Sequence, residues 1–245
     1  MPALAETRVG RTFGRVAAAY DRTRPGYPPV AIDRAVEELC LSPDAAVLDL
    51  AAGTGKLTRL LRERFDDVVA VEPDDEMRTY LPGALAGSAE SIPLAADTVD
   101  AVFVGEAFHW FDAPRALAEI ARVLRPGGGF AVLDNAWGEG RQPGVLPAPF
   151  KEDLDRIWGR FHPPDVTFPD WRDELPASPF GTLGHASFEW TVRLSGRDLV
   201  DLQLTASTPA SIEDDERQAV AERAYPLVDP EYELRVHTEL SWTRL

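Results

Sequence analysis

Short apolar runs, separated by helically spaced segments, dominate the first half of the chain. Residues 46–50, 68–71 and 99–104 are almost continuously apolar, which is the pattern of parallel strands buried on both faces. Between the first two runs, residues 57–61 place leucines at helical spacing, with charged side chains on the opposite face. Because buried parallel strands must be covered by helices, this pattern predicts an α/β fold.

The second half of the chain follows a different pattern. Residues 137–180 contain eight prolines around one predicted helix at 151–161, which predicts an insertion rather than part of the sheet. We expect this insertion to roof a substrate cavity. The aromatic side chains expected to be buried there are Trp158, Phe161, Phe168, Trp171 and Phe180.

Beyond the insertion the pattern returns to regular elements. Alternating residues at 186–194 predict a strand, residues 197–205 and 212–227 predict helices, and residues 234–245 predict a final strand.

Acidic residues lie at the ends of the first two predicted strands. Asp49 interrupts the first apolar run, Gly53 and Gly55 follow it, and Glu72 ends the second run. Glycines allow the turn to adopt angles that other residues avoid and let a ligand approach the main chain closely. A carboxylate about 20 residues after such a turn can accept both ribose hydroxyls, so the pattern indicates a nucleoside site.

The spacing of this turn excludes two common phosphate-binding motifs. A dinucleotide fold would have glycine at position 58, where this chain has threonine. Lys56 follows the second glycine without the four-residue spacing of a P-loop. A nucleoside without phosphates therefore fits better.

Residues 46–55 resemble motif I of the class I S-adenosylmethionine-dependent methyltransferases, and Glu72 resembles the acidic residue that holds the ribose in that family. Residues 87–94 look like the family's adenine-contacting segment, in which Glu90 would face the exocyclic amine. Residues 122–130 look like its helix-to-strand turn, with the glycines ending the helix. The resemblance implies a Rossmann-like fold with a seven-stranded, mostly parallel sheet flanked by helices, an antiparallel last strand and a helical and loop cap over the active site.

The resemblance also implies a cofactor and its binding residues. The cofactor is S-adenosyl-L-methionine, which leaves as S-adenosyl-L-homocysteine. Ala51 and Ala52 stand where the family often has Gly-Cys. The residues expected to bind the cofactor are Tyr20, Arg24, Asp49, Ala51, Gly53, Thr54, Gly55, Glu72, Pro73, Met77, Ala89, Glu90, Glu106 and Ala107.

The N-terminal segment carries a further similarity. Residues 20–28 resemble the opening of small-molecule methyltransferases related to the trans-aconitate type, in which this segment folds across the cofactor. As a lid, Arg24 would meet the methionine carboxylate or an acidic acceptor, and Tyr20 would close over the sulfonium side. Alternatively, Arg24 pairs with a surface acid and Tyr20 fills a helix interface.

We expect one methyltransferase domain over residues 1–245. Its parts are an N-terminal lid (1–28), a cofactor-binding core (29–137), a cap insertion (138–182) and C-terminal strands and helices that complete the sheet (183–245).

Methyl transfer from a sulfonium is an in-line displacement that depends mainly on alignment in a dry site. His109 is the candidate base for an acceptor that must lose a proton, because it follows the carboxyl end of a predicted central strand. It could equally hydrogen-bond the main chain or shape the cavity, and Glu106 is a further candidate base. The expected substrate pocket consists of Phe108, His109, Trp110 and Phe111, although these aromatic residues would also suit packing against the next helix.

The composition of the chain limits the kinds of partner that it is expected to bind. The net charge of −16, with no clustered basic run, argues against nucleic acid and favours a small-molecule acceptor. Cys40 is the only cysteine, so no internal disulfide forms, and it is expected to be buried on an apolar helix face. The four histidines are scattered, so we expect no metal site. Without a spanning segment or a signal-peptide core, the chain is expected to be cytoplasmic; its oligomeric state is not indicated.

The leading hypothesis is methyl transfer to a small metabolite or natural product. Because a cofactor site does not fix the chemistry, two alternatives stay open. One is a tailoring enzyme that uses the cofactor without methylating, for example in a cyclisation. The other is a non-catalytic regulatory module that senses the cofactor.

Overall fold

The computed structural model describes residues 13–137, 145–161 and 170–245, which form two compact units. The sheet unit comprises the described residues of 26–135, 168–188 and 237–245, and the helical unit comprises those of 1–25, 136–167 and 189–236. Each unit has a hydrophobic core of its own.

Seven strands form one sheet in the order β3-β2-β1-β4-β5-β7-β6. The neighbours from β3 to β5 pair in parallel, and β7 is antiparallel. The prediction of a seven-stranded, mostly parallel sheet with an antiparallel last strand is confirmed. The strands are β1 (Ala46–Leu50), β2 (Asp67–Glu72), β3 (Leu85–Ala86), β4 (Val99–Gly105), β5 (Leu124–Ala136), β6 (Gly184–Ser195) and β7 (Glu231–Arg244).

The sheet is wound in both directions from its centre. From β1 the chain proceeds outward through β2 to β3, whereas β4 and β5 lie on the other side of β1. In open sheets of this kind, ligands bind beyond the carboxyl ends of the strands where the winding direction changes. Here that place is the junction of β1 and β4.

Helices cover both faces of the sheet, as the continuous apolar strands require. On one face α3 (Pro29–Glu38) and α4 (Lys56–Arg62) pack against Ala101 and Phe103 of β4. On the other face α6 (Ala113–Val123) and η3 (Trp171–Ala177) pack against Val99, Val102 and Val104. The short elements α5 (Asp75–Arg78) and η2 (Phe108–Trp110) follow the ends of β2 and β4.

The prediction that the glycines at 127–129 end a helix is wrong. Helix α6 ends at Val123 and β5 begins at Leu124, before the first of these glycines. Pro126 disfavours helical angles at the residue before it, and the left-handed Gly127 lies where the β4–β5 register shifts. The glycines therefore form an irregularity inside a strand.

Cys40 is exposed, so the expectation that it is buried is wrong. Helix α3 ends at Glu38, and Cys40 adopts a left-handed φ of 54° while its amide donates to Glu37 O at 3.0 Å. The turn ends the helical periodicity, so the thiol leaves the apolar face that Ile32 and Leu39 occupy.

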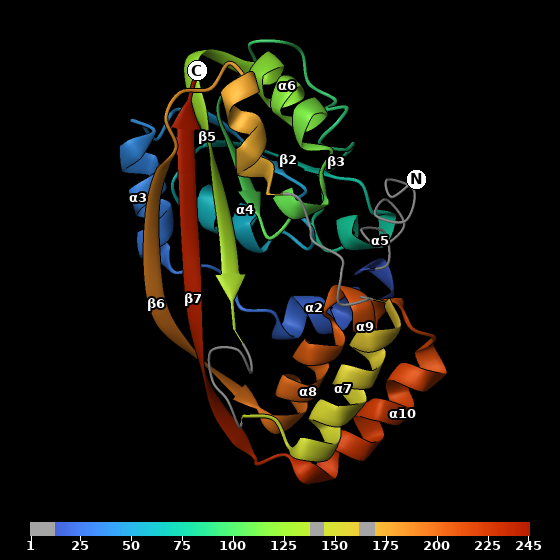
Figure 1. The fold of residues 1–245 in the computed structure, drawn as a ribbon. Helices are drawn as coiled ribbons and strands as arrows, with labels where there is room; N and C mark the ends of the chain where they lie inside the picture. The colour runs from blue at the N-terminus through green and yellow to red at the C-terminus, as the bar shows by residue number, and fades with distance from the viewer. Residues whose placement is uncertain (1–12, 138–144, 162–169) are drawn as a thin grey trace. The chain divides into compact units, whose positions relative to one another are not determined.

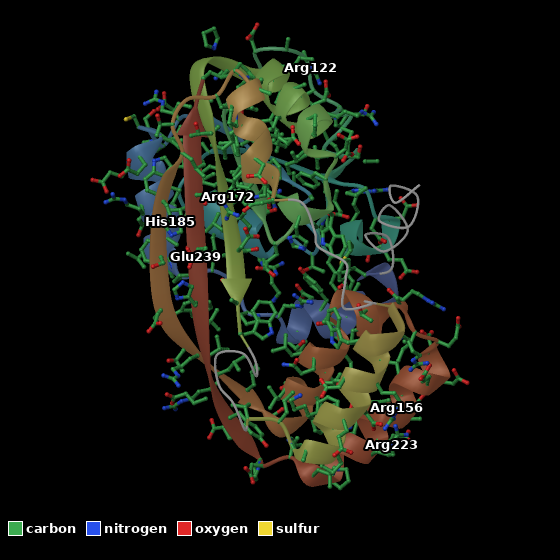
Figure 2. The ribbon with its side chains drawn as sticks, in the orientation of Figure 1. Arg122, Arg156, Arg172, His185, Arg223 and Glu239 are labelled. Carbon is green, nitrogen blue, oxygen red and sulfur yellow. The ribbon has the colours of Figure 1, made fainter. Side chains whose placement is uncertain are left out.

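The helical unit is built around three longer helices. Helices α7 (Ala148–Phe161), α8 (Gly196–Leu204) and α10 (Asp214–Ala224) lie side by side in Figure 1 and share one apolar core. Asp153 of α7 pairs with Arg156 at 2.6 Å and with Arg223 of α10 at 2.8 Å (Figure 2). The unit also contains η1 (Phe13–Val16), α2 (Ala17–Thr23), α9 (Ser207–Ser211) and η4 (Tyr225–Leu227).

The aromatic residues of the predicted insertion have different surroundings. Trp171 and Phe180 are buried in the sheet unit, where both pack against Phe130. Trp158 is 36% exposed, so the expectation that it is buried is wrong. Phe168 and the Phe161 side chain lie outside the described residues.

Candidate functional site

The glycine turn, residues 51–55, leads from β1 into α4 in an unusual backbone conformation. Ala51, Gly53 and Gly55 have φ angles of 59°, 57° and 84°. A left-handed alanine costs on the order of 1 kcal/mol or more, so the turn is held by its surroundings. Its amides contribute, because Ala52 N donates to Val71 O at 3.0 Å. A side chain added at Gly53 would meet no atom within 4 Å, so a ligand has room to approach the main chain there.

Glu72 links the glycine turn to the element that follows β2. Its Oε2 accepts from Gly53 N at 2.8 Å, and its Oε1 accepts from Asp74 N at 2.9 Å. Arg78 Nη1 donates to the Glu72 carbonyl at 2.7 Å. The carboxylate is 6% exposed, and burial raises its pKa despite the two amides. Glu72 is therefore fixed beside the glycine turn before any ligand binds.

Asp49 is buried at the end of β1, and only one of its two carboxylate oxygens accepts a hydrogen bond within the described residues. The Thr58 hydroxyl donates to Asp49 Oδ2, whereas Oδ1 has no hydrogen bond within the described residues. Burial raises the pKa of Asp49 to about 7, and the charge of Glu72 adds to this effect while Thr58 opposes it. Thr54 Oγ1 is a second buried atom without a hydrogen bond in the described part of the chain. Buried polar groups are normally paired, so these two atoms fit a site completed by a polar ligand.

Two residues of this arrangement were missed by the sequence argument. Thr58 occupies the position where a dinucleotide motif has its third glycine, and it is completely buried on the inner side of α4. The sequence offered one signal for Thr58, because a carboxylate buried at the end of the preceding strand needs a hydrogen-bond donor nearby. Asp74 caps α5 by accepting from the amides of Glu76 and Met77, a pattern readable as an acid just before a helix.

The predicted adenine-contacting segment is anchored to α6. Glu90 Oε1 accepts from Asp112 N at 3.1 Å, and Ala89 is buried. Arg122 of α6 donates to the carbonyls of Leu94 at 2.7 Å and Ile92 at 2.9 Å (Figure 2). The structure therefore fixes the segment on the same side of the sheet as α6. Among the other predicted cofactor residues, Met77 is buried at the start of α5, directly after the Glu72–Pro73–Asp74 sequence.

The residues after β4 divide into packed and exposed side chains. Glu106 has a left-handed φ of 56°, and its carboxylate accepts from Asn135 N. Phe108, next to the buried Ala107, is 1% exposed, with its ring centroid 4.5 Å from that of Trp171. His109 is exposed, and its ring lies 4.8 Å from the Trp110 ring. The ring of Phe111 packs 5.1 Å from that of Phe108.

Tyr20 and Arg24 belong to the helical unit. Arg24 donates from Nε to Thr205 Oγ1 at 3.0 Å and from Nη2 to Thr205 O at 2.9 Å. Its guanidinium also lies 5.0 Å from the ring centroids of Tyr20 and Trp137. The N-terminal segment is thus fastened to α8, and its role as a lid stays a prediction.

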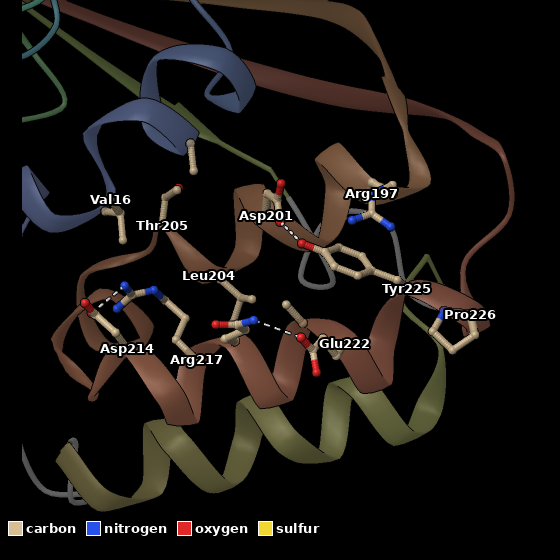
Figure 3. A pocket seen from close by; sticks show the side chains of 13 residues that line it. Val16, Arg197, Asp201, Leu204, Thr205, Asp214, Arg217, Glu222, Tyr225 and Pro226 are labelled. Atoms are coloured by element: carbon tan, nitrogen blue, oxygen red, sulfur yellow. Dashed lines mark hydrogen bonds and ion pairs between the residues drawn. The ribbon is translucent and has the colours of Figure 1, made fainter.

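The helical unit also contains a cavity of about 840 Å³ between η1, α2, α8 and α10. Its polar side chains are paired with one another: Tyr225 Oη donates to Asp201 at 2.6 Å, Arg217 pairs with Asp214 at 2.7 Å, and Gln218 donates to Glu222 at 2.9 Å (Figure 3). None of the predicted site residues lines it.

Within the described ranges, no group of three or more histidine, cysteine or acidic side chains is placed to hold a metal ion. The helices of those ranges are also too short or too polar to cross a bilayer.

Comparison with known proteins adds to this geometry. The family model of the methyltransferase domain matches residues 48–132, which include the glycine turn. An uncharacterized methyltransferase of Mycobacterium tuberculosis is 44% identical over 207 residues, covering 80% of this chain and 76% of that protein. The malonyl-[acyl-carrier protein] O-methyltransferase of Methylococcus capsulatus is 37% identical over 142 residues, which cover 50% of each chain. A solved structure from Anaeromyxobacter dehalogenans, described as a type II methyltransferase, aligns with a TM-score of 0.56 at 25% identity, over 90% of this chain and 97% of that one.

Proposed function

The chain belongs to the class I S-adenosylmethionine-dependent methyltransferases, and we propose that it transfers the methyl group to a small-molecule acceptor by in-line displacement. The observation that carries the proposal is the glycine turn, where Asp49 and Thr54 keep buried polar atoms without a hydrogen bond in the described residues and a side chain at Gly53 would meet no atom within 4 Å. S-adenosylmethionine supplies the methyl group already activated on a sulfonium.

The residues around the glycine turn fit a nucleoside with an amino acid side chain. Glu72 is fixed by two amides and retains lone pairs that suit ribose hydroxyls. Asp49 offers a free oxygen that suits a positively charged or hydrogen-bonding group near the turn. Glu90 is assigned to the adenine amine. Tyr20 and Arg24 are assigned to a lid over the bound cofactor.

A small acceptor fits the charge of this chain. The net charge of −16 disfavours phosphate backbones, because nucleic-acid binding depends on neutralisation by lysine and arginine. The Methylococcus relative is named for action on malonyl-[acyl-carrier protein], and it supports an acceptor outside the nucleic acids. We assign the acceptor pocket to the exposed side of the segment that carries His109 and Trp110.

Calorimetric titration with S-adenosylmethionine tests the site. Glu72→Gln removes the charge of a carboxylate that bonds the turn, and charged hydrogen bonds contribute about 1.5–3 kcal/mol, so affinity should fall about 100-fold. Asp67→Asn is the matched control, because Asp67 is exposed at the opposite end of the same strand. Equal affinity of the Glu72→Gln variant and the wild type would contradict the assignment of the site. A product without one added methyl group by mass spectrometry would contradict methyl transfer.

A further inference from the structure

A second carboxyl group, Asp134, is half-buried near the carboxyl end of β5. Phe130 and Val132 of this strand belong to the core under α6 and η3, and alternation places Asp134 on the same face. Within the described residues, the Asp134 carboxyl forms no hydrogen bond, although part of it is removed from solvent. An ionisable group kept in this state is costly for folding and points to a use.

The antiparallel strand β7 brings Glu239 beside Asp134. Thr238 Oγ1 donates to Asn135 Oδ1 at 2.6 Å, and Leu245 N donates to Gly128 O at 2.9 Å. Both contacts fit one register, in which Glu239 is the cross-strand neighbour of Asp134 on the same face.

Glu239 in turn holds two imidazoles. His185 Nε2 of β6 lies 2.8 Å from Glu239 Oε2 (Figure 2). His237 Nε2 contacts Glu239 Oε1. We call Asp134, His185, His237 and Glu239 the carboxylate–histidine cluster. The Glu239 carboxylate faces the two rings. It therefore acts on Asp134 through its negative charge and not through a hydrogen bond.

Charged groups from two elements act on Asp134. They are Glu239 from β7, which also contacts His237 and His185, and Asp170 and Arg172 at the start of η3. Burial raises the pKa of Asp134 to about 6; Arg172 opposes this, and Asp170 and Glu239 add to it. The carboxyl is therefore ionised at neutral pH and is more basic than an ordinary aspartate, which suits the acceptance of a proton.

Asp134 and the glycine turn lie on opposite sides of the change in winding direction between β1 and β4. Gly105 at the end of β4 pairs with Leu133, and Glu106 N donates to Leu133 O at 2.9 Å, so Asp134 is level with the segment that leads to His109. The glycine turn and Glu72 belong to β1 and β2, on the other side of the winding change. With the cofactor on the β1 side, the acceptor is left with the ends of β4 and β5.

From this placement, and given the proposed function, we propose that Asp134 takes the proton from an acceptor that is methylated on a neutral hydroxyl or amine. The acceptor oxygen or nitrogen forms a bond to the methyl carbon while the sulfur–methyl bond breaks and leaves its electron pair on sulfur. The acceptor proton passes to Asp134 Oδ and then to solvent. Glu239 is a positioning residue, because it acts on the basicity of Asp134.

The first test needs no acceptor. In the full-length protein labelled with [¹³C]carboxyl aspartate, the signal that Asp134→Asn removes should titrate with a midpoint near 6. In Glu239→Gln the midpoint should move lower, because a neighbouring negative charge is lost. A midpoint near 4 in the wild type would overturn the proposal.

The second test measures transfer of labelled methyl from S-adenosylmethionine to a panel of alcohols, phenols, primary amines and carboxylic acids. We expect product from a hydroxyl or amine acceptor, and a kcat that rises with pH through about 6. Asp134→Asn should lower kcat by about 100-fold or more, which is the typical contribution of a general base, with KM and cofactor affinity nearly unchanged. His109→Gln, run in parallel, distinguishes Asp134 from the base assigned by sequence, and Asp67→Asn, at the exposed start of β2, is the matched control.

Two results would overturn the assignment of Asp134. One is a kcat of Asp134→Asn within threefold of the wild type at an unchanged melting temperature. The other is an enzyme that binds the cofactor yet methylates only carboxylic acids or no member of the panel. Failure of the proposed function is distinguishable, because the wild type would then not bind S-adenosylmethionine in the calorimeter.

Discussion

The two sides of the winding change between β1 and β4 each contain an aspartate with a raised pKa, yet they are built differently. Asp49 lies beside a glycine turn whose parts follow one another within 25 residues of the chain. The charged groups that act on Asp134 come from β7 and the start of η3, which follow it by 36 to 105 residues. The first arrangement is local and the second is tertiary.

The difference separates two kinds of function. A site for one cofactor can be encoded in a strand, a turn and a helix, because their geometry repeats wherever that sequence pattern occurs. An acceptor site must be shaped for one substrate, and the site proposed around Asp134 draws on β7 and η3, which carry no such pattern. Variants on the two sides should therefore affect different measurements.

The largest expected effect is on the pH dependence of stability, through Asp49. Its pKa is about 7 in the folded protein against an ordinary value of 3.8, so its contribution to stability is present below pH 4 and is lost as the pH rises through 7. Between pH 4 and pH 8, the free energy of unfolding of the wild type should fall relative to Asp49→Asn by up to roughly 4 kcal/mol. Urea denaturation of both proteins across this range measures the gap, and a gap that does not change with pH would show that Asp49 has an ordinary pKa.

A smaller effect is expected at Thr58, which supplies a hydrogen bond to the Asp49 carboxylate. Thr58→Val removes the donor while keeping the shape, so stability at pH 8 should fall by about 2 kcal/mol, the size of a hydrogen bond to a charged group. Thr58→Ser restores the hydroxyl and should recover most of this loss. Equal stability of the valine and serine variants in urea would argue that packing, rather than the hydrogen bond, matters at this position.

The smallest effect concerns Arg172, which is 38% exposed beside the carboxylate–histidine cluster. In Arg172→Gln the pKa of Asp134 should rise, because a nearby positive charge is lost, while the pKa of Asp49 should stay the same. Stability at neutral pH should change by under about 0.5 kcal/mol, as is usual for an exposed charge. Carboxyl ¹³C titration reads both aspartates in one sample, with Arg125→Gln at the other end of β5 as the control. A rise in the pKa of Asp49 in Arg172→Gln would show that the charges on the two sides are coupled, against the comparison drawn above.

The sequence by itself determined the parallel core and the glycine turn. The apolar runs fix which residues are buried on both faces, and the position of Glu72 after its strand places it at the turn, where its bonds to Gly53 and Asp74 form. These are local consequences of strand alternation, glycine angles and chain connectivity, so they could be predicted without the rest of the molecule.

Only the tertiary structure decided what the remaining groups do. In the sequence, Phe108 suits a pocket and a core equally well, and its packing against Trp171 places it in the core. Cys40 suits a buried position in the sequence, but the turn after α3 exposes it. Asp134 has no signature in its own segment, because its pKa is raised first by burial and then by the charges of Asp170 and Glu239, all of which the fold brings about. Electrostatic and packing energies depend on distances in space, and for residues far apart in the chain those distances are set by the fold.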